Sequence, residues 1–511
     1  MFKVWSYFLV ILCTCLNPNA LLAQSTTDKD HLIRNISLID GTGRPAYTAS
    51  VRVSGNRIIA IGDLLPKKNE SVIDGKGLIL TPGFIDSHSH HLSYLRKNPE
   101  ALATANQGIT TIVIGQDGSG YLMDTLESFF RNERFAVNIA SYTGQTTLRE
   151  MVMGKDDLSR KSTREELEKM KELLKVEMKK GSLGLSTGLE YEGAFFSSKD
   201  EVTDLAKMAA SFNGRYISHI RSEDLNLNDA LQEIIEIGRV THMPVQISHI
   251  KIANKDDWGS AGKVISILEK ARKEGIRITA DVYPYTYWNS TLRVLFPDKQ
   301  FKNLKSAELA VEKLFDPMES VLVRYAPIPA YEGKTVAEIS KIRNEKLAET
   351  LIQLVAIADD FSRKNPDSES VEAIAGKSMH ENDVRAFIKW PYSNICSDGN
   401  AGGHPRGYGA FTRVLGKYVR EGNVLKMEEA IYKMTGLTAK HLGIRDRGII
   451  AVGNYADLVL LDPSSVTDHA TLQDSHALSS GIEMVWVNGK ITYVKQKSTG
   501  VFPGMLLKRQ D

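Results

Sequence analysis

A closely spaced histidine pair is the first feature of this sequence that could do chemistry. His88 and His90 end the segment Thr81-Pro82-Gly83-Phe84-Ile85-Asp86-Ser87-His88-Ser89-His90. Side chains two residues apart on a strand point to the same side. A turn followed by a short apolar strand would therefore aim both imidazoles the same way, and the pair predicts a metal site.

Two later histidines each follow an apolar, strand-like run. His219 ends Arg215-Tyr216-Ile217-Ser218-His219, and His249 ends Pro244-Val245-Gln246-Ile247-Ser248-His249. Each alone could equally be a hydrogen-bonded group at the rim of a barrel. Imidazole is a common metal ligand and a catalytic zinc needs three protein ligands, so the four histidines together favour a centre for one or two Zn²⁺ ions. The remaining histidines, among them His91, His242, His380 and His441, are expected to be structural or on the surface.

An aspartate late in the chain completes the set. Asp398 follows the short run Asn394-Ile395-Cys396-Ser397 and precedes Gly399. Alone, Asp-Gly is typical of a turn. A metal lowers the pKa of bound water, and a carboxylate beside it can take the proton and return it to a departing amine. We therefore predict Asp398 as the catalytic acid/base and expect Cys396 to pack in the core.

These residues must be positioned by alternating short apolar runs and helical patterns. The runs fall at residues 84–86, 110–114, 183–185, 216–218, 245–248 and 277–280. Between two of them, Thr163 and Glu166 predict a capping box at the start of a helix that Gly181 ends. Such alternation over about 350 residues predicts a (β/α)₈ TIM barrel across residues 81–444, with its chemistry at the carboxyl ends of the strands.

The two ends of the chain have a different pattern. Residues 30–80 and 445–505 contain short β-like runs separated by Gly, Asp and Asn, which predicts a small β-sandwich built from both termini. Residues from about 292 to 380 break the rhythm of the barrel. We expect an insertion over the strand ends, which is either a lid or a set of ordinary long loops with helices.

The charge balance indicates which partners are excluded, and the amino-terminal residues indicate where the protein is located. With 64 basic and 62 acidic residues, the chain has no positive field for nucleic acid or anionic lipid. Lys3 precedes an apolar run that is too short to span a bilayer, so residues 1–23 are predicted to be a signal peptide, cleaved after Ala23 or Ala20. We expect export to the periplasm without a membrane span. Only Cys396 then remains, so the mature chain forms no internal disulfide.

Further segments carry a resemblance to a known family. They are Leu185-Ser186-Thr187-Gly188-Leu189-Glu190-Tyr191, His219-Ile220-Arg221-Ser222-Glu223, Ile247-Ser248-His249-Ile250-Lys251, Asp281-Val282-Tyr283-Pro284-Tyr285 and His404-Pro405-Arg406-Gly407-Tyr408-Gly409. With the histidines, and in this order, they resemble the amidohydrolase superfamily and within it the N-acyl-D-amino-acid deacylase (D-aminoacylase) family. The resemblance covers roughly residues 33 to 500.

The resemblance implies a zinc-dependent hydrolase that converts small N-acyl-D-amino acids to a carboxylate and a free D-amino acid. It implies that His219 and His249 hold the main zinc, and that His88 and His90 line a second metal position. Arg, Lys and Tyr are suitable donors for the carboxylate of such a substrate. The residues that the resemblance assigns to substrate binding are Tyr191, Lys251, Tyr283, Ser290 and Arg406. For Lys251 and Arg406, salt bridges at the barrel rim are the alternative.

Two positions depart from the family pattern. The family usually has a cysteine ligand where this chain has Asp117, in Gly115-Gln116-Asp117-Gly118. We predict Asp117 as a metal ligand, because zinc accepts carboxylate oxygen, although a harder ligand can change the number and identity of the metals. Gln145 stands where histidine is expected, and no lysine near the fourth strand could form the carbamylated bridge used elsewhere in the superfamily.

Three alternatives remain open at the level of the sequence. The first is a cyclic-amide hydrolase similar to dihydroorotase or hydantoinase, which the His404-Pro405-Arg406 motif and the missing lysine disfavour. The second is a dipeptidase. The third is an exported binding protein that kept the barrel and lost hydrolysis, an idea suggested by Asp117 and disfavoured by the retained histidines and Asp398.

Overall fold

A computed structural model of the chain describes residues 30–368, 370–400 and 402–510. The predicted signal peptide at residues 1–23, with Cys13 and Cys15, lies outside the described residues. Within the described ranges, none of the helices combines the length and the apolar character that crossing a bilayer requires.

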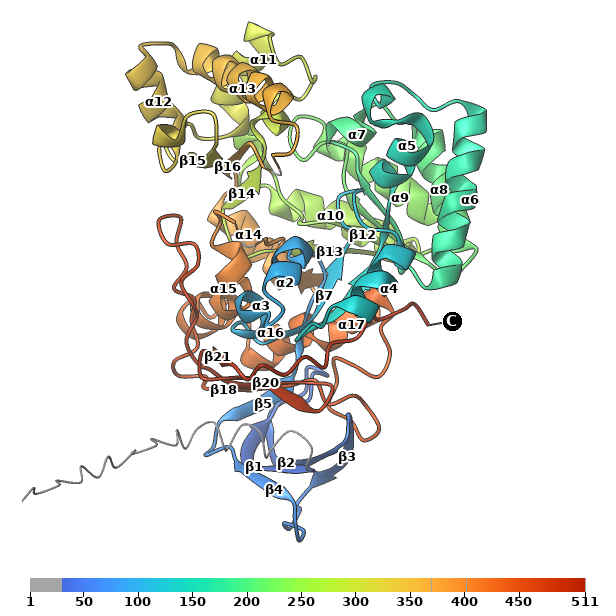
Figure 1. The fold of residues 1–511 in the computed structure, drawn as a ribbon, viewed down its shortest axis with the longest axis vertical. Coiled ribbons are helices and arrows are strands. Elements are labelled where there is room, and N and C mark those ends of the chain that lie inside the picture. Colours follow the sequence, from blue (N-terminus) through green and yellow to red (C-terminus); the bar gives the residue numbers. More distant parts are fainter. Residues whose placement is uncertain (1–29, 369, 401, 511) are drawn as a thin grey trace, which may run out of the picture.

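A barrel of parallel strands forms the centre of the molecule (Figure 1). The strands are β6 (Phe84–Asp86), β7 (Ile109–Ile114), β8 (Asn138–Ser141) continued by β9 (Thr143–Gly144), β10 (Gly184–Gly188), β11 (Arg215–His219), β12 (Val245–Ile247), β13 (Ile278–Val282) and β17 (Ser393–Ile395). Leu183 N donates to Ser141 O, joining β10 to β8, and Asp398 N donates to His88 O, closing the barrel between its last and first strands. The predicted (β/α)₈ barrel is confirmed.

Helices cover the outside of this barrel. They are α2 (Leu92–Lys97), α3 (Leu102–Ala105), α4 (Met123–Asn132), α5 (Gln145–Met153), α6 (Arg164–Lys180), α7 (Glu192–Phe195), α8 (Lys199–Ala210), α9 (Leu227–Thr241), α10 (Ala261–Lys273), α14 (Glu381–Lys389), α15 (Arg406–Arg413), α16 (Met427–Met434) and α17 (Gly436–Leu442). The capping box predicted at Thr163 and Glu166 starts α6, and Gly181 ends it in the left-handed conformation. The buried face of α6, with Met170 and Leu174, packs in the main hydrophobic core.

Both ends of the chain contribute strands to one nine-stranded sheet, which lies at the lower end of the molecule in Figure 1. Its strands are β1 (His31–Leu38), β2 (Tyr47–Ser54), β3 (Arg57–Gly62), β4 (Ser71–Asp74), β5 (Ile79–Pro82), β18 (Leu458–Leu461), β19 (Ile482–Val487), β20 (Lys490–Val494) and β21 (Lys497–Ser498). The two halves meet where β5 pairs antiparallel with β18. Val51 from one half and Trp486 from the other belong to the same buried cluster, so the sheet encloses a core of its own.

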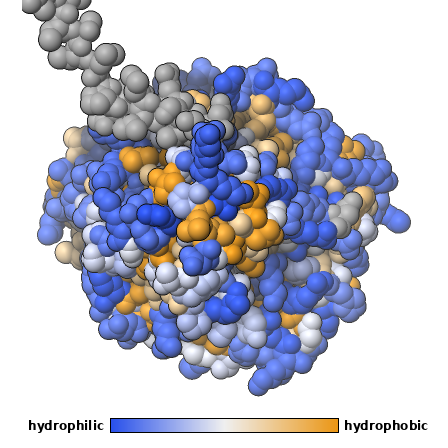
Figure 2. All heavy atoms as spheres, turned by 90° about the horizontal axis from the view of Figure 1, so that it is seen from below, coloured by the Kyte–Doolittle hydropathy of each residue, from blue (hydrophilic) through white to orange (hydrophobic). Residues whose placement is uncertain are grey.

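Two boundaries of this terminal region differ from those expected. Thr81 and Pro82 still pair within the sheet, so the barrel begins at Phe84. After β21 the chain returns to the barrel, where Ile139 of β8 exchanges backbone hydrogen bonds with Met505 and Leu507. Figure 2 views this end from below and shows apolar side chains near the middle of a largely hydrophilic face.

An insertion stands over the opposite end of the barrel (Figure 1). It contains β14 (Tyr287–Ser290), η3 (Leu292–Leu295), α11 (Leu304–Leu309), η4 (Ala310–Leu314), β15 (Val321–Tyr325), η5 (Pro329–Tyr331), α12 (Val336–Arg343), α13 (Leu347–Lys364) and β16 (Glu372–Lys377). The insertion begins earlier than residue 292, because β14 pairs with β16. Its buried cluster, which includes Leu322 and Leu351, is separate from the core of the barrel.

Candidate active site

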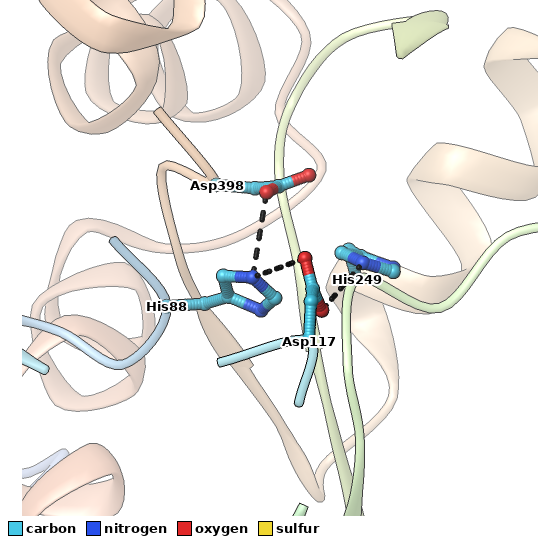
Figure 3. A group of neighbouring side chains, drawn as sticks. All are labelled: His88, Asp117, His249 and Asp398. Carbon is cyan, nitrogen blue, oxygen red and sulfur yellow. Dashed lines mark ion pairs between the residues drawn. The ribbon is translucent and has the colours of Figure 1, made fainter. Parts of the chain in front are cut away.

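A cluster of imidazoles and carboxylates lies at the carboxyl ends of the barrel strands. His88 follows β6, Asp117 follows β7, His249 follows β12 and Asp398 follows β17. Each residue offers a ligand atom, and these four atoms all lie within 4.8 Å of one another. Figure 3 shows the side chains converging, with the Asp117 carboxylate between the two histidines. Strands far apart in the sequence therefore meet at one point, as the sequence predicted.

The spacing of the ligand atoms fits a bound divalent cation. His88 Nε2 lies 3.4 Å from a carboxylate oxygen of both Asp117 and Asp398, and His90 Nε2 lies 3.3 Å from the same two oxygens. Most hydrogen bonds are shorter than this. Tetrahedral ligands bound about 2.0–2.1 Å from zinc are about 3.3–3.4 Å apart. Asp117 Oδ1, which is buried and has no hydrogen-bond partner, lies 3.5 Å from His249 Nε2.

The second predicted zinc ligand, His219, joins the cluster from β11. Its Nδ1 atom lies 3.1 Å from His249 Nε2, and its Nε2 atom lies 2.8 Å from Glu190 Oε2. A carboxylate on the far nitrogen of a ligating histidine fixes the orientation and the tautomer of the ring. Glu190 is thus a positioning residue that sequence reasoning missed. Its signal was a carboxylate directly after strand β10, next to the predicted Tyr191.

A buried lysine and glutamate lie on the other side of His249. Lys251 Nζ donates to both carboxylate oxygens of Glu223 at 2.7 and 2.8 Å and lies 2.6 Å from His249 Nδ1. Glu223 and His249 also form, with His219, a second group that could hold a metal ion. Lys251, predicted to bind substrate, is therefore at the site but is held by an acidic partner.

Arg406 has a similar arrangement with Asp398. Its Nη1 atom lies 2.6 Å from Asp398 Oδ2, and both side chains are buried. The guanidinium group of Arg406 lies over the ring of Tyr283, with its carbon 4.9 Å from the ring centroid. The Tyr283 hydroxyl is directed at Met379 Sδ, 3.9 Å away, and Tyr283 is not among the residues that line the cavity. The structure therefore does not bring Tyr283 to the cavity wall, where its predicted role in substrate binding would place it.

The backbone turns sharply where the ligands are placed. Asp117, His249 and Asp398 have φ values of 57°, 34° and 48°. Non-glycine residues rarely adopt this left-handed region, and each such residue costs about 1–3 kcal/mol. The buried strand ends hold these conformations, which direct all three side chains toward the same centre.

Carboxylates and imidazoles in the cluster shift one another's pKa values. Burial opposes a charge on His90, but hydrogen bonds with Asp117 and Asp398 raise its pKa to about 9. Burial and Lys251 oppose a charge on His249, yet Glu223, Asp398 and Asp117 raise its pKa to about 10. The imidazoles outweigh burial and hold the pKa of the Asp117 carboxyl well below its usual range. The raised pKa values of the two imidazoles and the lowered pKa of the Asp117 carboxyl indicate that the cluster favours positive charge beside its carboxylates.

A cavity of about 830 Å³ opens onto this cluster, a volume typical of small-molecule sites. Tyr191 and Ser290, both predicted to bind substrate, line it from the barrel and from the insertion respectively. His88 lies behind the lining with no exposed surface. Gln145, the second departure from the family pattern, is buried in α5, where it donates to Glu201, and does not line the cavity.

The other histidines and Cys396 lie outside the cluster. His91 contacts Ser89 Oγ and Gly407 O, His380 caps α14, and His441 Nδ1 contacts Asn394 Oδ1. His242 follows α9 in the left-handed conformation. The Cys396 thiol is buried and donates to Asp281 Oδ1 at 3.3 Å.

A (β/α)₈ barrel with histidines and aspartates gathered at its strand ends is typical of metal-dependent hydrolases. The sequence matches the amidohydrolase family over residues 71–319 and 394–493. The chain belongs to the amidohydrolase family.

Characterised relatives match nearly the whole chain. D-aminoacylase and N-acyl-D-aspartate deacylase, both from Alcaligenes xylosoxydans xylosoxydans, are each 32% identical to it. These alignments cover 94% and 97% of this chain, and 98% of each relative. The structure of N-acyl-D-glutamate deacylase from Bordetella bronchiseptica, complexed with zinc and a phosphonate inhibitor, superposes with a TM-score of 0.83 at 28% identity. That comparison covers 94% of this chain and 100% of the other.

Proposed function

We propose that the protein hydrolyses the amide bond of N-acyl-D-amino acids, releasing a carboxylate and a free D-amino acid. The observation that carries this proposal is the meeting of the metal-binding cluster with Arg406 and Lys251 at one cavity. The cluster is suited to activating water, and the two cations are suited to a substrate carboxylate.

The cofactor we propose is Zn²⁺, one ion or two. The donor set of imidazole nitrogen and carboxylate oxygen suits zinc, and the ligand spacing agrees with it. A divalent zinc ion lowers the pKa of bound water and polarises a carbonyl group. The residues that would hold the metal are His88, His90, Asp117, His219 and His249, with Asp398 beside them.

We propose that Asp398 moves the proton, and its contacts support this role. It lies within 3.4 Å of His88 and His90 through Oδ1 and is held by Arg406 through Oδ2. We propose that it takes a proton from the attacking water and delivers it to the amide nitrogen, so that the amine leaves neutral. Arg406 and Lys251 would bind the substrate carboxylate and orient the scissile amide toward the cluster.

The experiment that tests this function compares mirror-image substrates. The purified mature protein is assayed with N-acetyl-D-methionine, N-acetyl-D-glutamate, their L-forms and a hydantoin, with bound metal measured in the same preparation. We expect release of the D-amino acid, little activity on the L-forms, and at least one zinc per chain. Turnover of the hydantoin alone, or metal-loaded protein without any turnover, would contradict the proposal.

We also propose that the protein is exported to the periplasm. The support is the pattern of residues 1–23, a basic start followed by a short apolar run and alanine. Expression with and without this segment, followed by cell fractionation and mass analysis of the amino terminus, tests the proposal. Retention of the intact segment in the cytoplasm would contradict it.

A further inference from the structure

Lys299 is a basic side chain in the wall of the cavity. It belongs to the insertion, between η3 and α11, and lines the same cavity as Asp117 and Asp398. Its ammonium lies 5.3 Å from the centroid of the Phe195 ring. In the part of the chain that the structure describes, no carboxylate lies within ion-pair distance of it. Lys299 also has a left-handed backbone, with φ 57°, in a turn that directs the side chain inward.

The carboxylates nearest Lys299 hydrogen-bond or ion-pair with other residues. Four of them act electrostatically on the ammonium at longer range: Glu190, Asp224, Glu192 and Asp298. Their own partners are His219 at 2.8 Å, the Ser222 hydroxyl at 2.5 Å, Arg293 at 2.5 Å and the Ser306 hydroxyl at 2.8 Å, respectively. A partly buried lysine that forms no ion pair with the described carboxylates keeps donors available for an anion from outside the protein.

The other cations of the cavity are differently placed. Arg406 is held by Asp398, and Lys251 is held by Glu223, both next to the metal-binding cluster. Lys155 lies on the exposed rim. Lys299 is therefore a further basic group of this cavity, whose lining also includes Glu190 and His219.

Resting on the proposed function, we propose that Lys299 binds a carboxylate on the side chain of the substrate, so that N-acyl derivatives of acidic D-amino acids are preferred. The substrate would use Arg406 and Lys251 for its α-carboxylate and Lys299 for the second carboxylate. Apolar lining residues such as Trp288 and Leu314 are left for the methylene and acyl groups. Overall similarity does not choose the substrate, because identity to D-aminoacylase and to N-acyl-D-aspartate deacylase is the same, 32%.

The test measures kcat/KM for N-acetyl-D-glutamate and N-acetyl-D-methionine with the zinc-loaded protein. We expect the native protein to prefer the acidic substrate at least about tenfold. Lys299→Met should lower kcat/KM for the acidic substrate about 10- to 100-fold, because a charge-assisted hydrogen bond is lost. The same variant should keep its activity on N-acetyl-D-methionine within about threefold, which also shows that it is folded.

Two further variants serve as a matched control and as a charge reversal. Lys155→Met removes a lysine from the rim of the same cavity and should leave the preference unchanged. Lys299→Glu should favour N-acetyl-D-lysine, a gain that misfolding cannot produce.

A native preference for N-acetyl-D-methionine, or an unchanged substrate ratio in Lys299→Met, would overturn this inference and leave the proposed function standing. Failure to hydrolyse any N-acyl-D-amino acid would overturn both.

Discussion

The barrel mouth and the insertion face the same cavity but are built in different ways. At the barrel mouth, His88, His249 and Asp398 are buried and held by strand ends that hydrogen-bond to one another. The insertion has its own core, and it presents partly exposed residues such as Trp288 and Lys299 to the cavity. The cluster is thus held by the main core of the barrel, whereas the residue that we propose for substrate selectivity, Lys299, belongs to a unit with a separate core.

The largest expected effect breaks the chemistry at the barrel mouth. Asp398→Asn removes the proton acceptor, and we expect kcat to fall about 10³–10⁴-fold. Secondary structure, followed by circular dichroism, should stay native, and the matched change Asp468→Asn, on the pair with Arg413 away from the cluster, should leave kcat nearly unchanged. Native turnover by the Asp398→Asn protein would show that proton transfer takes place elsewhere.

The next largest effect is expected at Glu190, which contacts His219 Nε2. Glu190→Ala should weaken zinc binding about 10- to 100-fold, because loss of an outer partner frees the ligand ring. The measurement is competition with a chelator, monitored independently of activity. Glu190→Gln keeps an acceptor for His219 Nε2 and should recover most of the affinity. Equal affinity in the alanine and native proteins would mean that the contact at 2.8 Å does not position the ligand.

A smaller effect is expected from a substitution that destabilises the core of the insertion alone. Leu351→Ala opens a cavity in its core and should cost about 2–5 kcal/mol of local stability. We expect KM to rise about three- to tenfold, with kcat and metal content close to native. Ile342→Ala, at an exposed position on α12, serves as the control. A loss of bound zinc in Leu351→Ala would show that the two regions share one folding unit.

The smallest expected effect is a difference between the two regions in how their stability depends on pH, measured in metal-free protein. Burial raises the pKa of Glu372 in the insertion to about 7, so this group makes stability fall as pH rises from about 4.5 to 7. The pKa values of His90 and His249 are raised to about 9 and 10, so their contribution is complete below pH 6.5 and is lost as pH rises through those values.

Hydrogen exchange can follow the two regions separately between pH 5 and 10. Above pH 7, only the metal-free barrel mouth should continue to lose protection, and zinc should remove that loss. Parallel behaviour of both regions across the whole range would contradict this assignment.

Much of the barrel and of its ligand set could be predicted from the sequence. Parallel strands are buried on both faces and give continuous apolar runs, such as Ile109–Ile114. A polar residue directly after such a run, such as His249 or Asp398, must lie at the barrel mouth. Asp117 was assigned to the cluster through the family resemblance, because it stands where the family has a cysteine ligand, and the structure brings it between His88 and His249.

Other features depend on side-chain direction and on distant pairing, which periodicity does not encode. The direction of the Tyr283 hydroxyl, the contact of Glu190 with His219 and the free ammonium of Lys299 are examples. The start of the insertion at Tyr287 was missed because β14 is recognisable only through its pairing with β16, more than eighty residues later. The buried place of Gln145 likewise depends on its contact with Glu201 on α8.

The pairing of β5 with β18 has a consequence for biosynthesis. The two strands are separated by nearly four hundred residues. In protein expressed without residues 1–23 and folding as it is made, β5 therefore stays unpaired on one edge while the entire barrel is translated. At about 5–20 residues per second, that interval is about 20–80 s. During this time the sheet formed by the first strands has an open edge able to join a second nascent chain. Slower translation or a carboxy-terminal truncation should therefore favour aggregation.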